Sequence, residues 1–130
     1  MCLRLKSKKT KVCIAKEDII CYKFLIRSVY DDNGVYRTPY KNFPITIGSE
    51  YTSELNKDEF LVDMGLHTFK NLEDTRKRAS LNTYYTICKC LIPKGSRYYK
   101  GTFNTFDNHW NDVWFESYAS DRLIYLEIIK

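Results

Sequence analysis

Apolar side chains recur at every second position between residues 17 and 30, as they do in a β-strand that buries one face. The side chains that share this face are Ile20, Tyr22, Phe24 and Ile26. The tetrapeptide Asp31-Asp32-Asn33-Gly34 follows, and Asn-Gly is the strongest short signal for a hairpin turn. Residues 35–40 are therefore predicted to form the returning strand of a hairpin.

Further apolar runs predict more strands, at residues 45–51, 65–69, 83–92 and 122–129. The last of these is apolar on both faces, as expected for a strand that is covered on both sides. A helix is predicted from Asn71 to about Leu81, with Asn71 and Asp74 spaced as in a capping box. Residues 52–63 are acidic and fit either a helical turn or a loop, residues 98–106 are aromatic and turn-rich, and residues 110–118 carry no decisive pattern.

The length of 130 residues indicates one domain. Aromatic residues make up 15% of the chain, and Tyr dominates them, which favours strands with half-exposed rings. We therefore expect an α+β fold with a twisted, mostly antiparallel sheet and one or two helices. No run approaches the ~18 apolar residues of a membrane span, and no signal peptide is visible, so a cytoplasmic location without membrane contact is expected.

The formal net charge of +5 comes entirely from the N-terminal segment. Residues 1–16 carry +6 and no acid, whereas residues 17–130 sum to −1. This predicts a basic N-terminal arm, residues 1–16, followed by a single domain, residues 17–130. Such an arm can contact phosphates, but no recognition motif accompanies it, so a nucleic-acid partner is not favoured.

The five cysteines are Cys2, Cys13, Cys21, Cys88 and Cys90. None forms a Cys-x-x-Cys pair, and their spacing from the two histidines does not indicate a zinc site. They are interpreted as small core residues in a reducing compartment, with no metal bound. The chain also contains no nucleophile elbow, phosphate-binding loop or dinucleotide fingerprint.

An ordered series of short segments carries the one family resemblance. Tyr22-Lys23 lies on the first long strand, Gly65-Leu66-His67-Thr68-Phe69 precedes the helix, and Ile92-Pro93-Lys94-Gly95 ends a strand. Glu116 then precedes a polar turn and the final strand. Over roughly residues 18–129 this order resembles the mono-ADP-ribosyltransferase fold. The chain also resembles small uncharacterised proteins of gut bacteria and their phages.

The departures from that family concern the residues that would bind and turn over NAD. Lys23 stands in the place of an Arg, and Lys lacks the planar fork that binds a pyrophosphate in a bidentate way. His67-Thr68-Phe69 replaces Ser-Thr-Ser. Of the Glu-x-Glu pair of the family, only Glu116 remains. In the family that carboxylate stabilises the positive charge that develops on the ribose. The resemblance therefore implies a fold that is kept and a reaction that is altered or lost.

The first hypothesis is a non-catalytic binding protein, encoded by a phage or mobile element, that holds a nucleotide-like ligand or a host protein and counters host defence. No cofactor is expected. The predicted ligand contacts, which would meet in one cleft, are Tyr22, Lys23, His67, Thr68, Tyr98 and Tyr99. Aromatic rings in such a cleft would stack on a nucleobase.

Two alternatives stay open. In the first, the protein is an active ADP-ribosyltransferase that uses NAD, with Glu116 as the catalytic carboxylate and with Lys23 and His67 as cofactor contacts. The simpler interpretation of Glu116 is a surface ion pair with Arg122. In the second, the protein is a structural accessory component whose Tyr-rich surface forms a homo-oligomer.

Overall fold

A computed structural model describes residues 3–27, 36–39 and 41–129 of the chain. Within these ranges it contains one short helix, α1 (Leu72–Ala79), and thirteen strands. The strands are β1 (Leu3–Arg4), β2 (Cys13–Ile14), β3 (Ile19–Arg27), β4 (Tyr36–Arg37), β5 (Pro44–Ile45), β6 (Glu50–Thr52), β7 (Asn56–Asp58), β8 (Leu61–Met64), β9 (Leu66–Phe69), β10 (Tyr85–Ile92), β11 (Arg97–Phe106), β12 (Asp112–Ser120) and β13 (Arg122–Ile129).

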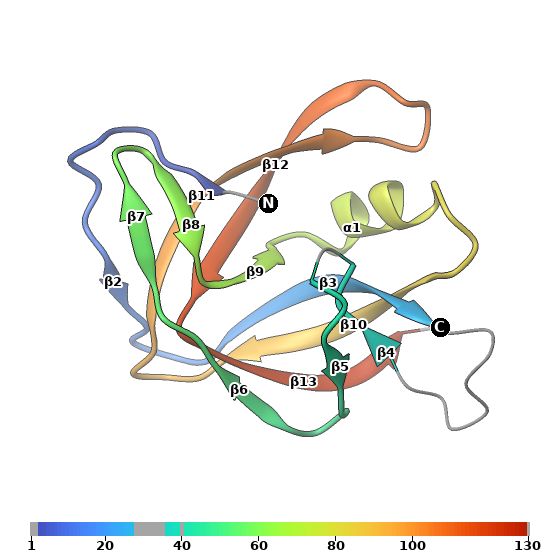
Figure 1. The fold of residues 1–130 in the computed structure, drawn as a ribbon, viewed down its shortest axis with the longest axis horizontal. Helices are drawn as coiled ribbons and strands as arrows, with labels where there is room; N and C mark the ends of the chain where they lie inside the picture. The colour runs from blue at the N-terminus through green and yellow to red at the C-terminus, as the bar shows by residue number, and fades with distance from the viewer. Residues whose placement is uncertain (1–2, 28–35, 40, 130) are drawn as a thin grey trace.

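The strands join into one sheet in which every recorded pair is antiparallel. Its main path runs β6-β13-β10-β3-β9-β12-β11-β1-β8-β7, and the sheet bends strongly along this path (Figure 1). The predicted mostly antiparallel sheet is therefore confirmed, and it is accompanied by a single short helix. The more specific expectation of an ADP-ribosyltransferase-like core stays a prediction.

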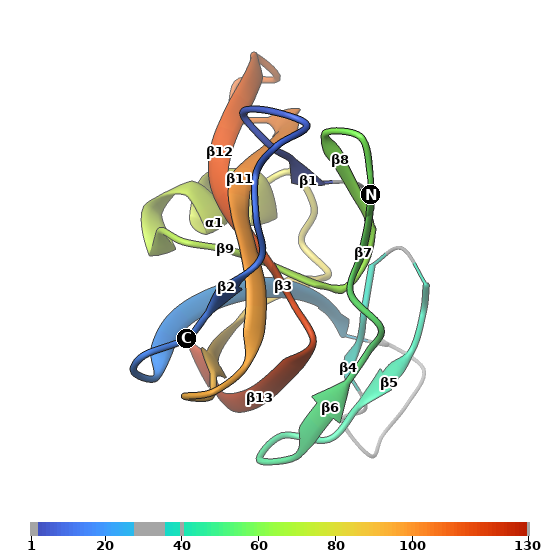
Figure 2. The same ribbon diagram turned by 90° about the vertical axis from the view of Figure 1, so that its left-hand side faces the viewer.

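The two faces of β3 pack against different parts of the molecule, because its side chains alternate. Phe24 joins a cluster with Phe69 and Phe115 beneath α1. Cys21 and Leu25, on the other face, belong to a cluster with residues of β10 and β13. Figure 2 shows α1 on one side of β3 and the segment from β4 to β6 on the other. This second side holds the cavity described below.

Several predicted elements are confirmed with shifted ends. The strand predicted over residues 17–30 is β3, and those predicted over 65–69, 83–92 and 122–129 are β9, β10 and β13. The returning strand is seen as β4, which pairs with β3, whereas the Asn33-Gly34 turn lies outside the described residues. The segment 45–51 splits into β5 and β6 at Gly48, whose φ of 91° places it in the left-handed region.

Three expectations about secondary structure were wrong. Residues 52–63 were expected to form a helical turn or loop, but most of this segment lies in the β7–β8 hairpin. Residues 98–106, expected to be turn-rich, lie in β11, which pairs along its whole length with β12. The last strand, β13, is fully buried on one face at Leu123 and Tyr125 and only partly buried on the other. In β11 and in the β7–β8 hairpin, the side chains on both faces are mixed in polarity, which hid the alternation.

The helix is shorter than predicted and its N-terminus is capped differently. It ends at Ala79, and Asn71 precedes it without a side-chain hydrogen bond to the helix backbone. The Asn71 amide instead donates to the Asp74 carboxylate at 3.2 Å, so the predicted capping box does not form. Within the described ranges, no helix has the length and apolar character that crossing a membrane requires.

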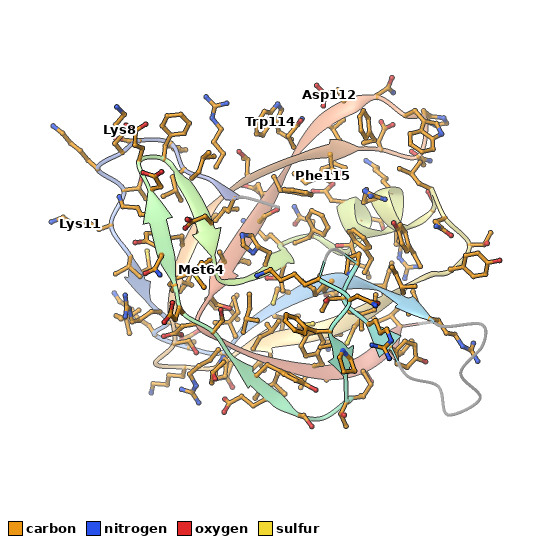
Figure 3. All side chains as sticks on the ribbon, viewed as in Figure 1. Lys8, Lys11, Met64, Asp112, Trp114 and Phe115 are labelled. Carbon is orange, nitrogen blue, oxygen red and sulfur yellow. The ribbon has the colours of Figure 1, made fainter. Side chains whose placement is uncertain are left out.

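The basic N-terminal segment is integrated into the sheet rather than projecting from it as an arm. β1 pairs with both β11 and β8, and Leu3 and Leu5 are 0% and 3% exposed. A Cβ on Gly101 of β11 would overlap the backbone of Arg4, so this crossing requires glycine. The lysines themselves point outward, as Figure 3 shows for Lys8 and Lys11. Burial of Leu3 and Leu5 therefore holds this segment in the sheet, although its charge alone indicated a solvated arm.

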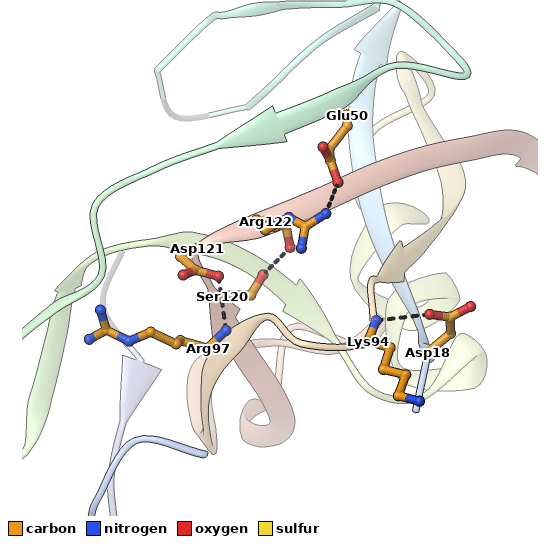
Figure 4. A network of polar contacts seen from close by, with 7 residues as sticks. All are labelled: Asp18, Glu50, Lys94, Arg97, Ser120, Asp121 and Arg122. Carbon is orange, nitrogen blue, oxygen red and sulfur yellow. Dashed lines mark hydrogen bonds and ion pairs between the residues drawn. The ribbon is translucent and has the colours of Figure 1, made fainter. Parts of the chain in front are cut away.

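Polar contacts fix the turns at one end of the sheet (Figure 4). Asp18 accepts a hydrogen bond from the Lys94 backbone at 2.8 Å, and Asp121 accepts one from the Arg97 backbone at 2.9 Å. Arg122 pairs with Glu50 at 2.8 Å, which joins β13 to β6. The Arg122 guanidinium thus has a different partner from the predicted Glu116.

Candidate functional site

A cavity of about 530 Å³ lies on the face of β3 opposite to α1. Its walls come from β3, the segment from β4 to β6, the β8–β9 connection and β13. Small-molecule sites typically measure ~300–1,000 Å³. The cavity is therefore large enough for a ligand of nucleotide size.

Lys23 is the cation in the β3 wall of this cavity. It is half-buried, and its Nζ donates a hydrogen bond of 2.7 Å to the backbone carbonyl of His67 on β9. Cys21 precedes it on the same face of the strand, and Cys90 pairs with Cys21 from β10, so the base of the side chain stands on apolar residues. Among the described residues, no carboxylate lies within 4.0 Å of the ammonium.

This environment disfavours the charged form of Lys23. Burial lowers the pKa of its ammonium to about 8, and the positive charge of Lys41 adds to the decrease. A lysine pKa falls in this way when desolvation is not offset by a carboxylate. Lys23 is thus a mostly cationic group at neutral pH that would gain stabilisation from a bound anion.

His67 lies beside Lys23 in the same wall. Burial and the Lys23 charge lower the pKa of its imidazole to about 4, so the ring is neutral near pH 7. Its Nδ1 is 3.0 Å from the Gly65 carbonyl and its Nε2 is 3.4 Å from the Val62 carbonyl. Because a neutral imidazole has one N–H, the shorter contact favours the tautomer in which Nδ1 donates to Gly65.

Thr68 lies in a small slot that adjoins the cavity and also contacts Lys23 and His67. It is 4% exposed, and its hydroxyl has no hydrogen-bond partner of standard geometry among the described residues. Its polar neighbour is the thiol of Cys21, whose pKa burial raises to about 12 and the Thr68 hydroxyl lowers in part. Thr68 therefore lies next to Cys21 and Lys23 in the slot and does not line the open cavity.

The rest of the lining contains residues that sequence analysis missed. Lys41 adds a second cation and Asp63 an acid, while Phe43 is 59% exposed at the cavity rim. Tyr51 and Tyr125 form an edge-to-face pair with ring centroids 5.4 Å apart. The cavity therefore combines positive charge with aromatic surface. No local pattern could have indicated this set, because its members come from four separate segments.

Three of the predicted ligand contacts, namely Tyr22, Tyr98 and Tyr99, lie outside the cavity. Tyr22 is on the opposite face of β3 and packs into the aromatic cluster beneath α1. Tyr99 is 8% exposed in a cluster with Leu3, whereas Tyr98 packs against the Tyr118 ring. Adjacent residues of a strand point to opposite faces of the sheet, and this separates Tyr22 from Lys23 and Tyr98 from Tyr99. Of the six predicted contacts, the structure brings together Lys23, His67 and Thr68.

Glu116 is not among the residues that line the cavity. Its side chain is 52% exposed and pairs with the Lys70 ammonium at 3.6 Å, while its backbone carbonyl accepts from Lys70 N. The predicted meeting of Lys23, His67 and Glu116 in one cleft is therefore wrong for Glu116. The predicted partner of Glu116 was also wrong, since Lys70 takes the place of Arg122.

The prediction that the cysteines are core residues is confirmed for three of them. Cys21, Cys88 and Cys90 are fully buried, whereas Cys13 is exposed and Cys2 lies outside the described residues. In the described ranges, no three His, Cys, Asp or Glu side chains are arranged to hold a metal ion.

Comparisons of the chain with protein-family models, with curated proteins and with solved structures find no match. Function therefore has to be inferred from the chemistry of the cavity itself.

Proposed function

We propose that this protein is a binding protein whose cavity holds a small anionic ligand of nucleotide size. The observation that carries the proposal is Lys23, an ammonium in the wall of a cavity of about 530 Å³ with no carboxylate partner among the described residues. Removing a cation from water without a counter-charge is costly. A bound phosphate or carboxylate would supply that counter-charge.

The rest of the wall supports an anion attached to a planar group. Lys41 is a second cation at the cavity, and Asp63 is the one acid among its described lining residues. Tyr51 and the exposed Phe43 offer aromatic surface on which a nucleobase could stack. Lys is a point charge without the bidentate fork of Arg, which suits a terminal phosphate or a carboxylate better than a pyrophosphate clamp.

Binding is favoured over ADP-ribosyl transfer because of the position of Glu116. The transfer reaction requires a carboxylate next to the cation that binds the dinucleotide, where positive charge develops. Asp63 lines the cavity, but it is exposed and makes no ion pair with Lys23. We therefore assign the cavity to ligand retention.

Calorimetric titration of AMP, which carries a terminal phosphate, and of NAD and ADP-ribose into the wild-type protein and the Lys23→Met variant tests the proposal. Met keeps the length of the side chain and removes its charge. We expect at least one ligand to bind and the variant to bind it about tenfold more weakly, the equivalent of one charge-assisted contact. Lys70→Met, which alters a lysine outside the cavity, serves as the matched control and should bind like wild type. Equal affinities for wild type and Lys23→Met, or no binding of any ligand, would overturn the proposal.

A further inference from the structure

We propose that Lys23 forms an imine with its ligand, so that the cavity is a site for anions that also carry an aldehyde or ketone group. The inference rests on the proposed function, because it concerns the same cavity, and it adds a covalent step and a class of ligand. It follows from three features of the Lys23 amine, namely its position, its hydrogen-bond partner and its electrostatic surroundings.

The first feature is access. Lys23 lines the cavity and is half-buried rather than enclosed, so its side chain lies at the boundary that a ligand in the cavity would contact. The apolar residues Cys21 and Cys90 lie at the base of the side chain and limit the directions from which solvent reaches it. An amine at the boundary between an apolar wall and an open cavity is typical of lysines that form Schiff bases.

The second feature is the partner of Nζ. It donates to the backbone carbonyl of His67 at 2.7 Å, and in the described ranges it makes no ion pair. A neutral amine still has two N–H groups, so it can keep donating to that carbonyl while its lone pair is free. Loss of the proton therefore breaks no salt bridge. Lys70 differs in this respect, because deprotonation there would leave the Glu116 carboxylate without its partner.

The third feature is the set of charged and titratable groups that face Lys23. Burial and Lys41 favour the neutral amine, and the neutral His67 ring does not oppose it. Cys21 from β3 and Cys90 from β10 remain thiols, since burial raises the pKa of both. Asp63, Tyr51 and Tyr125 line the cavity without an ion pair or hydrogen bond to Nζ. With a pKa of about 8, roughly a tenth of the amine is unprotonated at pH 7.

The step balances without an oxidant or reductant. The lone pair of neutral Lys23 adds to the carbonyl carbon, and a proton moves from nitrogen to oxygen to give a carbinolamine. The carbinolamine then loses its hydroxyl group together with the remaining proton on nitrogen as water, which leaves a C=N bond between Nζ and the ligand. The reverse reaction consumes one water and frees the lysine, so retention is reversible.

Pyridoxal 5′-phosphate is a suitable probe because it joins an aldehyde, an aromatic ring and a phosphate in one molecule of the right size. The 130-residue protein is incubated with one equivalent of the probe at pH 8 and reduced with borohydride, which converts the imine into a stable secondary amine. The adduct is then mapped by peptide mass spectrometry. We expect one adduct, at Lys23, although the sequence contains fourteen lysines. Lys23→Met should lose that adduct, whereas Lys70→Met should keep it.

A matched probe separates this inference from the proposed function. 4′-Deoxypyridoxine 5′-phosphate lacks the carbonyl group but keeps the ring and the phosphate. If it binds in a manner that depends on Lys23 while the aldehyde probe leaves no reduced adduct on Lys23, anion binding stands and the imine is refuted. Adducts that are spread over surface lysines, and that are as abundant in Lys23→Met as in wild type, refute the imine as well. If neither probe binds and no adduct forms at Lys23, both proposals fail for this ligand class.

Discussion

Lys23 and Lys70 are both close to β9, yet their surroundings are opposite. Lys70 follows the end of β9 at the surface and pairs with the Glu116 carboxylate. Lys23 donates to a carbonyl within β9 and stands between an apolar base and a cavity. The charge of Lys70 is balanced by a carboxylate of the protein, whereas among the described residues Lys23 has no carboxylate partner. A lysine that the fold leaves unbalanced at a cavity points to a ligand, whereas a neutralised one at the surface does not.

The largest expected effect of this arrangement is a loss of folding stability at acid pH, and it comes from His67. Its folded-state pKa is about 4, against 6.5 in the unfolded chain, because burial and Lys23 disfavour the imidazolium. Between these values the unfolded state binds a proton that the folded state does not, so stability falls as the pH is lowered. From pH 7 to pH 4.5 the loss should be about 2 kcal/mol.

Urea unfolding of wild type and His67→Gln at both pH values measures that loss. Gln cannot titrate, so the free energy of unfolding of the variant should fall less than that of wild type by about the same 2 kcal/mol. Because other groups also titrate in this range, the difference between the two proteins is the quantity to compare. Parallel curves for the two proteins would show that His67 is not desolvated by the Lys23 region.

Replacement of Lys23 by Met should stabilise the protein at pH 7 by about 1–2 kcal/mol. The variant removes a desolvated cation and keeps the side-chain volume, while it loses one hydrogen bond of ~1 kcal/mol. Chemical unfolding at equilibrium gives the value. Lys70→Met should show no such gain, because the Lys70 charge is solvated and paired. A destabilised Lys23→Met variant would mean that the ammonium serves the fold, which would remove the contrast between the two lysines.

The stabilisation of Lys23→Met relative to wild type should decrease as the pH rises. The direction follows from the difference between the folded-state and unfolded-state pKa of Lys23. The folded-state pKa is about 8 and the unfolded value is 10.5, so between them the folded state releases a proton that the unfolded state retains. Stability therefore rises with pH across this window, and the penalty is fully present only below pH 8. The advantage of Lys23→Met over wild type should shrink by about 1–2 kcal/mol from pH 7 to pH 9.5. An advantage that is constant with pH would contradict the assigned burial of the ammonium.

The sequence predicted the sheet well where one face of a strand is continuously apolar, as in β3 and β10. It failed at β11 and at the β7–β8 hairpin, where polar and aromatic residues share both faces and pairing with distant strands decides the structure. Lys23 and His67 were identified as neighbours through a resemblance, and the structure places them together. Lys41 and Tyr51 could not be found in advance, because nothing in their local sequence shows that β4–β6 crosses over Lys23.

The smallest expected effect concerns Glu116→Gln, which tests whether the surface pair matters at all. Glu116 and Lys70 are separated by 3.6 Å with both side chains substantially exposed, so water and salt screen their attraction. We expect no measurable change in the free energy of unfolding at physiological ionic strength, and unchanged affinity for any ligand that the wild type binds. The matched measurement is calorimetric titration of that ligand into Glu116→Gln beside Lys23→Met. If the Gln variant lost binding and the Met variant kept it, the functional site would have to move from the cavity to the outer surface of β12, where Figure 3 shows Trp114 and Asp112.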